Sequence, residues 1–114
     1  MKRLFLWLAL MIVFSGAVEA SEVCWSIGKA DDDYREFAIA GNFAAYPKEF
    51  PEDVTYVVGA SSPGEDWPYI QPSQADAWAG HRTHPFKVVF NLTERPPGDC
   101  LLTVDLINMH PQAP

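Results

Sequence analysis

Residues 66–80, DWPYIQPSQADAWAG, place three large aromatic side chains, Trp67, Tyr69 and Trp78, close together in the sequence. Flat aromatic faces pack against the C–H groups of sugar rings at a low cost in side-chain entropy. Asp76, in the same stretch, could accept hydrogen bonds from sugar hydroxyls. The alternative is structural, because a small domain also needs large side chains to fill its core. The sequence leaves both interpretations open for this stretch.

A short basic cluster follows at residues 81–84, which contain His81, Arg82 and His84. A guanidinium can hold a carboxylate through two parallel hydrogen bonds, so Arg82 is a candidate for binding an acidic sugar, with His81 beside it. The imidazoles could also exchange protons in a reaction. Catalysis would need an oriented partner and a pocket, neither of which is visible in the sequence, and a polar turn explains the cluster more simply. We expect no catalytic residue here.

Asp31, Asp32 and Asp33 form the one acidic run that could hold a cation. Oxygen-rich loops bind calcium, but the alternating acidic positions and the distal glutamate of an EF-hand loop are missing. We expect no metal site and no cofactor, and calcium at these three aspartates is the alternative. A solvated acidic turn is the simpler explanation of the run.

Cys24 and Cys100 are the two cysteines of the chain. In an exported protein an even number of cysteines permits a disulfide, which would join the first and last expected strands. Two unpaired thiols are an equal alternative. No CxxC motif or histidine-rich spacing indicates a zinc site or redox chemistry.

The elements that must position these residues are strands. Pro68 and Pro72 remove backbone donors and fix φ, so the aromatic stretch must be part of a loop. Alternating apolar residues predict strands at 23–28, 54–59, 84–91 and 100–107, with a long irregular segment at 61–80 and either a short strand or a helical turn within 37–46. Such alternation is typical of half-buried antiparallel strands.

The fold class expected from these strands is all-β, most simply a β-sandwich. A sandwich usually has about seven or eight strands, and fewer are visible here. We therefore expect either a minimal domain or a sandwich that is incomplete at its C-terminus.

The N-terminus predicts export. Lys2 and Arg3 precede an uninterrupted apolar run from Leu4 to Phe14, and small residues follow up to Ala20. This is the pattern of a secretory signal peptide, and the run is too short to span a bilayer. We expect a signal peptide at 1–20, cleaved after Ala20, and a single domain at 21–114 that is secreted or periplasmic. We expect no stable membrane insertion after cleavage.

The net charge excludes one class of partner. The chain carries 15 acidic and 8 basic side chains, a formal charge of −7, and loss of the leader removes two basic residues and one acidic residue. The resulting field repels phosphate, so we expect no nucleic-acid partner.

Several aromatic signatures occur in an order that resembles a known family. The opening matches at Trp25, Ile27, Gly28, Asp31, Glu36 and Phe37, and the segments Tyr56-Val57-Val58-Gly59, Asp66-Trp67-Pro68-Tyr69 and Ala77-Trp78 follow in order. Together these resemble the third, carbohydrate-binding-module-like domain of the rhamnogalacturonan lyases of polysaccharide lyase family 4. The resemblance covers about residues 23–110.

The resemblance implies a galactose-binding-like jelly roll and an accessory role beside a lyase catalytic domain in polysaccharide degradation. It also implies further strands after the segment 101–107. The chain lacks the catalytic domain, so no lyase activity carries over.

Three functions remain open at this point. The first is a secreted, non-catalytic carbohydrate-binding module for a pectic or related plant polysaccharide. The second is a fragment of a polysaccharide-degrading lyase or another exported enzyme. The third is a structural domain whose aromatic side chains dock on a catalytic domain of a larger enzyme and bind no sugar.

Overall fold

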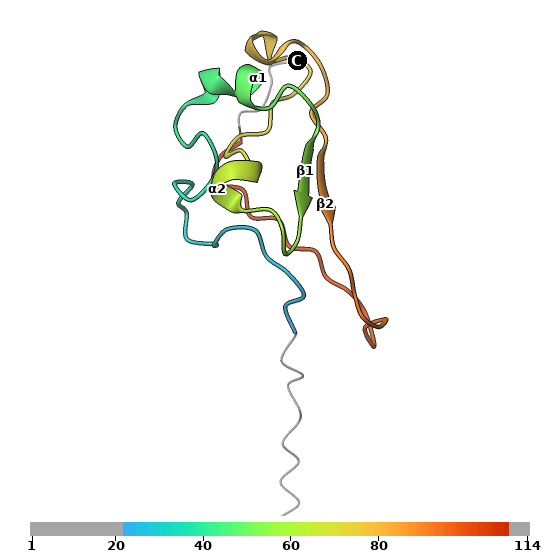
Figure 1. The fold of residues 1–114 in the computed structure, drawn as a ribbon. Coiled ribbons are helices and arrows are strands. Elements are labelled where there is room, and N and C mark those ends of the chain that lie inside the picture. The colour runs from blue at the N-terminus through green and yellow to red at the C-terminus, as the bar shows by residue number, and fades with distance from the viewer. Residues whose placement is uncertain (1–21, 110–114) are drawn as a thin grey trace, which may run out of the picture.

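A computed structural model describes residues 22–109 (Figure 1). Six short elements follow one another in this part of the chain: the 3₁₀ turn η1 (Phe43–Ala45), α1 (Tyr46–Glu49), β1 (Val54–Val57), α2 (Pro63–Asp66), the 3₁₀ turn η2 (Ala77–Ala79) and β2 (Phe86–Val89). None of them exceeds 4 residues, and long irregular segments connect them. Little helix and a central pair of strands agree with the expected β class.

β1 and β2 pair in parallel, from Val54 opposite Phe86 to Val57 opposite Val89. One further bond extends the ladder, in which the Val58 N–H donates to the Val89 carbonyl oxygen at 2.9 Å. Figure 1 shows the two arrows side by side and pointing the same way. The antiparallel pairing expected from the alternation is therefore wrong. Alternation fixes which face is buried, whereas the direction of pairing depends on the connection, and here that connection crosses over through α2 and η2.

The two strands expected in the middle of the chain are confirmed, since β1 lies within 54–59 and β2 within 84–91. The two expected at 23–28 and 100–107 form no ladder within residues 22–109. The face that we expected to be half-buried in the later segment is exposed, with Leu102 at 69% and Val104 at 68%. An alternating pattern favours an extended backbone, but a strand also needs a paired neighbour.

The core is small and aromatic. Tyr46, with 1% of its surface exposed, is in edge contact with the rings of Trp78 and His84. Val54 and Tyr56 of β1 are also buried, as their alternation predicts. The centre of the molecule therefore lies between α1, η2 and the first strand.

A backbone clasp fixes the start of the aromatic loop. The Ala38 N–H donates to the carbonyl oxygens of Pro63 and Trp67, and the Ala38 carbonyl oxygen accepts from the Tyr69 N–H at 3.1 Å. Ala38 and Pro68 are buried and form an isolated parallel bridge. The segment before η1 therefore holds Trp67 and Tyr69 in fixed positions.

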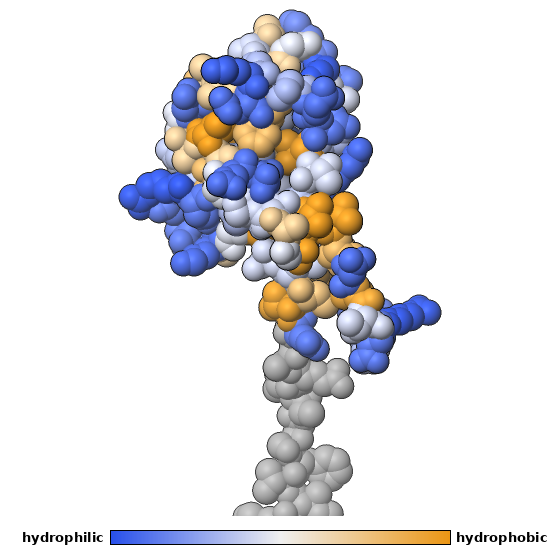
Figure 2. Space-filling model, in the orientation of Figure 1, coloured by the Kyte–Doolittle hydropathy of each residue, from blue (hydrophilic) through white to orange (hydrophobic). Residues whose placement is uncertain are grey.

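Both ends of the described chain carry exposed apolar side chains, among them Val23 at 74% and Leu101 at 92%. Figure 2 shows apolar atoms on the surface of the narrower end of the molecule. The expected signal peptide at 1–20 lies outside the described residues. Among residues 22–109, no helix is long and apolar enough to cross a bilayer.

Candidate functional site

A wide cleft lies between the aromatic loop and the two end segments of the described chain. Among the aromatic side chains that line it, four form two pairs of neighbouring rings: Tyr34, Phe43, Tyr69 and Trp78. We call these four residues the aromatic wall. The rings of Tyr34 and Tyr69 lie 5.2 Å apart, and those of Phe43 and Trp78 lie 5.1 Å apart. Tyr34 is 40% exposed and Phe43 is 49% exposed, so the wall presents ring surface to solvent.

Asp76 fixes the position of Trp78. Its Oδ1 accepts a hydrogen bond from the Trp78 Nε1–H at 3.2 Å, and its Oδ2 accepts from the Ser73 backbone N–H at 2.7 Å. The backbone hydrogen bond from Ser73 is the largest influence on the pKa of Asp76, which is lowered. These hydrogen bonds favour the ionised form of the carboxylate, which is why its pKa is lowered. Asp76 therefore holds both the loop backbone at Ser73 and the indole of Trp78 in position.

Trp67 lines the cleft, is half-buried and packs its ring against the sheet. Its ring meets Tyr56 at 5.9 Å and Phe86 at 5.0 Å, both in nearly perpendicular edge contacts. Those partners come from β1 and β2, so Trp67 anchors the loop to the sheet. Of the two interpretations left open by the sequence, the structural one describes this residue best.

Arg82 and His81 do not line the cleft. The Arg82 Nη2 donates to the Pro51 carbonyl oxygen at 2.9 Å, and Nη1 lies 3.7 Å from a carboxylate oxygen of Asp53. The exposed His81 has its Nδ1 3.1 Å from the carbonyl oxygen of Gln74. The structure therefore separates the two basic candidates from the aromatic candidates, and Arg82 ties the loop before β1 to the approach to β2.

The three aspartates form a turn. The Asp31 Oδ1 accepts from the Asp33 N–H, and Asp33 pairs with the guanidinium of Arg35 through hydrogen bonds of 2.8 Å and 3.0 Å from Nε. The side-chain hydrogen bond from Arg35 lowers the pKa of Asp33 to about 2. Among residues 22–109, no group of three or more histidine, cysteine or acidic side chains is arranged to hold a metal ion. The geometry gives the alternative of calcium at Asp31, Asp32 and Asp33 no support.

Cys24 and Cys100 are both exposed, and their thiols are free in this structure. Cys24 belongs to the first expected strand and Cys100 to the last, and neither segment is paired within the described chain. The pairing that would bring the two thiols together is thus not formed.

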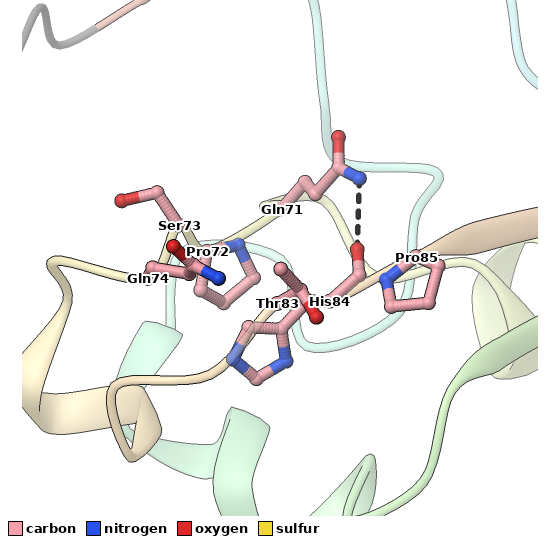
Figure 3. Close-up of a pocket in the computed structure, with 7 residues that line it drawn as sticks. All are labelled: Gln71, Pro72, Ser73, Gln74, Thr83, His84 and Pro85. Atoms are coloured by element: carbon pink, nitrogen blue, oxygen red, sulfur yellow. Dashed lines mark hydrogen bonds between the residues drawn. The ribbon is translucent and has the colours of Figure 1, made fainter.

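A second hollow adjoins the cleft, with a volume of about 420 Å³ (Figure 3). Seven residues line it: Gln71, Pro72, Ser73, Gln74, Thr83, His84 and Pro85. The Gln71 Nε2 donates to the His84 carbonyl oxygen at 2.9 Å and joins the two loops across the hollow. Sequence reasoning missed this hollow, because glutamine, serine and threonine in a loop are common and carry no signal by themselves.

Tyr34 and Phe43 were also missed. They stand far from the aromatic stretch in the sequence, one after the aspartates and one among alanines. Only the clasp at Ala38 brings their segment against the aromatic loop.

His84 is buried, with 5% of its surface exposed. Its Nε2 lies 3.1 Å from the Ala79 carbonyl oxygen, which can only accept, so Nε2 carries the proton. Its Nδ1 is buried and has no hydrogen-bond partner among the described residues. Burial lowers the pKa of His84, and the positive charge of Arg82 acts in the same direction.

Acidification is expected to destabilise the domain through His84. Because its pKa is lower in the folded chain than the ordinary value of 6.5, the unfolded chain binds the proton first. The stabilising effect is complete above pH 6.5 and is lost as the pH falls below it, by at most about 1.4 kcal/mol per pH unit. Urea unfolding at a series of mildly acidic pH values measures this slope.

Two variants test whether His84 causes this dependence of the unfolding free energy on pH. His84→Phe keeps an aromatic ring beside Tyr46 and should flatten the slope, whereas His81→Phe, at an exposed histidine, should leave it unchanged. A slope that survives His84→Phe would assign the proton uptake to another group.

Solvent-facing aromatic rings beside hydrogen-bonding side chains are features that sugar-binding sites share. A family model described as CBM-like, polysaccharide lyase family 4, domain III, matches residues 23–113. The chain belongs to this family, which supports the role of an accessory carbohydrate-binding module. No curated protein and no solved structure is significantly similar to the chain.

Proposed function

We propose that the protein is a secreted, non-catalytic module that holds a neutral chain of a pectic or related plant polysaccharide along the aromatic wall. The observation that carries the proposal is the pair of exposed ring contacts, Tyr34 with Tyr69 and Phe43 with Trp78, in one cleft. Two separate groups of aromatic rings suit a polymer, because each offers a ring face that can stack on a different sugar unit.

The charge distribution favours a neutral polymer over an acidic one. The formal charge of the chain is −7, and three cations of the described residues are paired with carboxylates of the protein. Arg35 pairs with Asp33, and Arg82 and Lys87 both lie within 4 Å of Asp53, at 3.7 Å and 3.6 Å. A polymer rich in carboxylates would meet a repulsive net field here, and Arg35 and Arg82 are already engaged by aspartates.

The family name extends the proposal to a partner. A third domain of a polysaccharide lyase works beside a catalytic domain, so we place this module on a polysaccharide together with such a domain, and assign it no lyase activity of its own. The signal peptide expected at 1–20 supports the proposal that the protein is secreted. The family resemblance supports the proposal of a galactose-binding-like jelly roll.

Alanine at Tyr34 or at Tyr69 is expected to abolish retardation of the protein in gels that contain a neutral galactan or arabinan. Each substitution removes half of one aromatic platform, and loss of a stacking partner typically weakens binding by about 1–3 kcal/mol, or about fivefold to a hundredfold. Affinity electrophoresis measures the effect, and thermal unfolding shows whether the fold survives.

Val57→Ala is the matched control, since Val57 is also 40% exposed and does not line the cleft. Unchanged retardation in the two tyrosine variants would reject the aromatic wall as the binding surface. Absence of binding in the unaltered protein, with recruitment to a lyase catalytic domain retained, would favour the docking function instead.

A further inference from the structure

The hollow of about 420 Å³ and the cleft form a continuous surface, because Gln71 and Ser73 line both. A polymer that lies along the aromatic wall therefore passes the mouth of the hollow. Volumes of about 300–1,000 Å³ are typical of small-molecule pockets, and this one lies at the lower end of that range.

The lining has no charged side chain. Gln71, Gln74 and Thr83 supply amide and hydroxyl groups, and Pro72 and Pro85 supply apolar ring surface. Figure 3 shows the Gln71 amide nitrogen engaged with the His84 carbonyl oxygen and the amide oxygen on the side away from it. Paired donors and acceptors around an apolar floor suit a sugar ring, which has hydroxyls at its edge and C–H groups on its faces.

One of the residues that line the hollow carries a buried polar atom without a partner. His84 is 5% exposed, lines the hollow, and has its Nδ1 without a partner among residues 22–109. A buried acceptor that lacks a donor is costly, and an ordered water beside it would satisfy it. The neutral imidazole also cannot attract a carboxylate.

We propose that this hollow is a specificity subsite that takes one neutral sugar unit of the bound polysaccharide through Gln71, Gln74 and Thr83 and excludes the corresponding uronate. The inference rests on the proposed function, because it assumes that a glycan lies in the adjoining cleft. It assigns the choice of sugar to the hollow and the retention of the polymer to the aromatic wall.

The test is a nuclear magnetic resonance titration of the ¹⁵N-labelled protein with free galactose and, separately, with galacturonate. These two sugars share a ring and differ at C6, where one has a hydroxymethyl group and the other a carboxylate. Galactose is expected to shift the side-chain amide signals of Gln71 and Gln74, and galacturonate is expected to leave them in place. Thr83→Val should weaken galactose binding about fivefold, as the loss of one neutral hydrogen bond predicts. Thr55→Val, at an exposed position of β1, should leave it unchanged.

The outcomes separate the subsite from the proposed function. Galactose shifts that persist in Tyr34→Ala, with polymer retardation lost, would support the division of roles. Polymer retardation in the unaltered protein without any shift at Gln71 and Gln74 would overturn the subsite and leave the proposed function standing. Equal shifts with galactose and galacturonate would overturn the exclusion of uronates.

Discussion

Tyr46→Ala is expected to remove a large share of the protein's folding stability. Tyr46 is 1% exposed, and its ring contacts Phe50, Trp78 and His84. Truncation of a buried aromatic side chain typically costs about 3–5 kcal/mol, and whole domains are stable by only about 5–15 kcal/mol. Urea unfolding followed by tryptophan fluorescence measures the loss.

Tyr46→Phe separates the ring from the hydroxyl and should change stability in the opposite direction. The Tyr46 hydroxyl is buried and has no hydrogen-bond partner among residues 22–109, and burial raises its pKa. Removal of an unsatisfied buried polar group is expected to stabilise the fold by about 1 kcal/mol or more. Phe43→Ala, which removes an exposed neighbour of Trp78, should cost much less than Tyr46→Ala. A destabilised Tyr46→Phe would show that the hydroxyl has a partner, such as an ordered water.

Trp67→Ala is expected to cost about 3–5 kcal/mol of stability, because the indole fills the space between Tyr56 and Phe86. Its loss would detach the aromatic loop from both strands of the sheet. The expected result is a large fall in the urea midpoint, measured beside Tyr69→Ala, which should lose polymer binding with a smaller change in stability.

Trp67→Phe is the control for this prediction, since it keeps an aromatic edge contact and should recover part of the lost stability. If Trp67→Ala unfolded like the unaltered protein but failed to bind polysaccharide, Trp67 would belong to the binding surface and not to the core. The two tryptophans of the loop would then share one role.

The sequence predicted the position of the sheet and the role of its buried face. Val54 and Tyr56 alternate with exposed residues, as the pattern requires, and the proline-rich aromatic stretch forms the expected loop. The direction of pairing could not be predicted, because period-two alternation is the same for parallel and antiparallel strands. The exposure of Leu102 and Val104 could not be predicted either. An alternating pattern shows which side chains share a face, but it does not show which other segment, if any, covers that face.

The structure brings some of the candidate residues together and separates others. Tyr69 and Trp78 line the cleft, whereas Arg82 bonds to Pro51 and Asp53, and the Trp67 ring packs against the sheet. The sequence showed which side chains have the chemistry to bind a ligand. It could not say which of them the protein uses for its own hydrogen bonds, because those partners lie 29 or more positions apart or on other elements.

The crossover between β1 and β2 has a consequence for how the protein folds. Two parallel strands cannot be joined by a tight turn, so the segment from Val58 to Pro85 must close into a large loop before the first ladder bond can form. That segment contains Tyr69, Trp78 and Gln71, so the aromatic loop is enclosed when the two strands pair. Contacts between residues far apart in sequence slow folding, because the entropy of loop closure is lost before the contacts stabilise the chain. The loop that supplies Tyr69 and Trp78 to the cleft is therefore also the loop whose closure slows formation of the sheet.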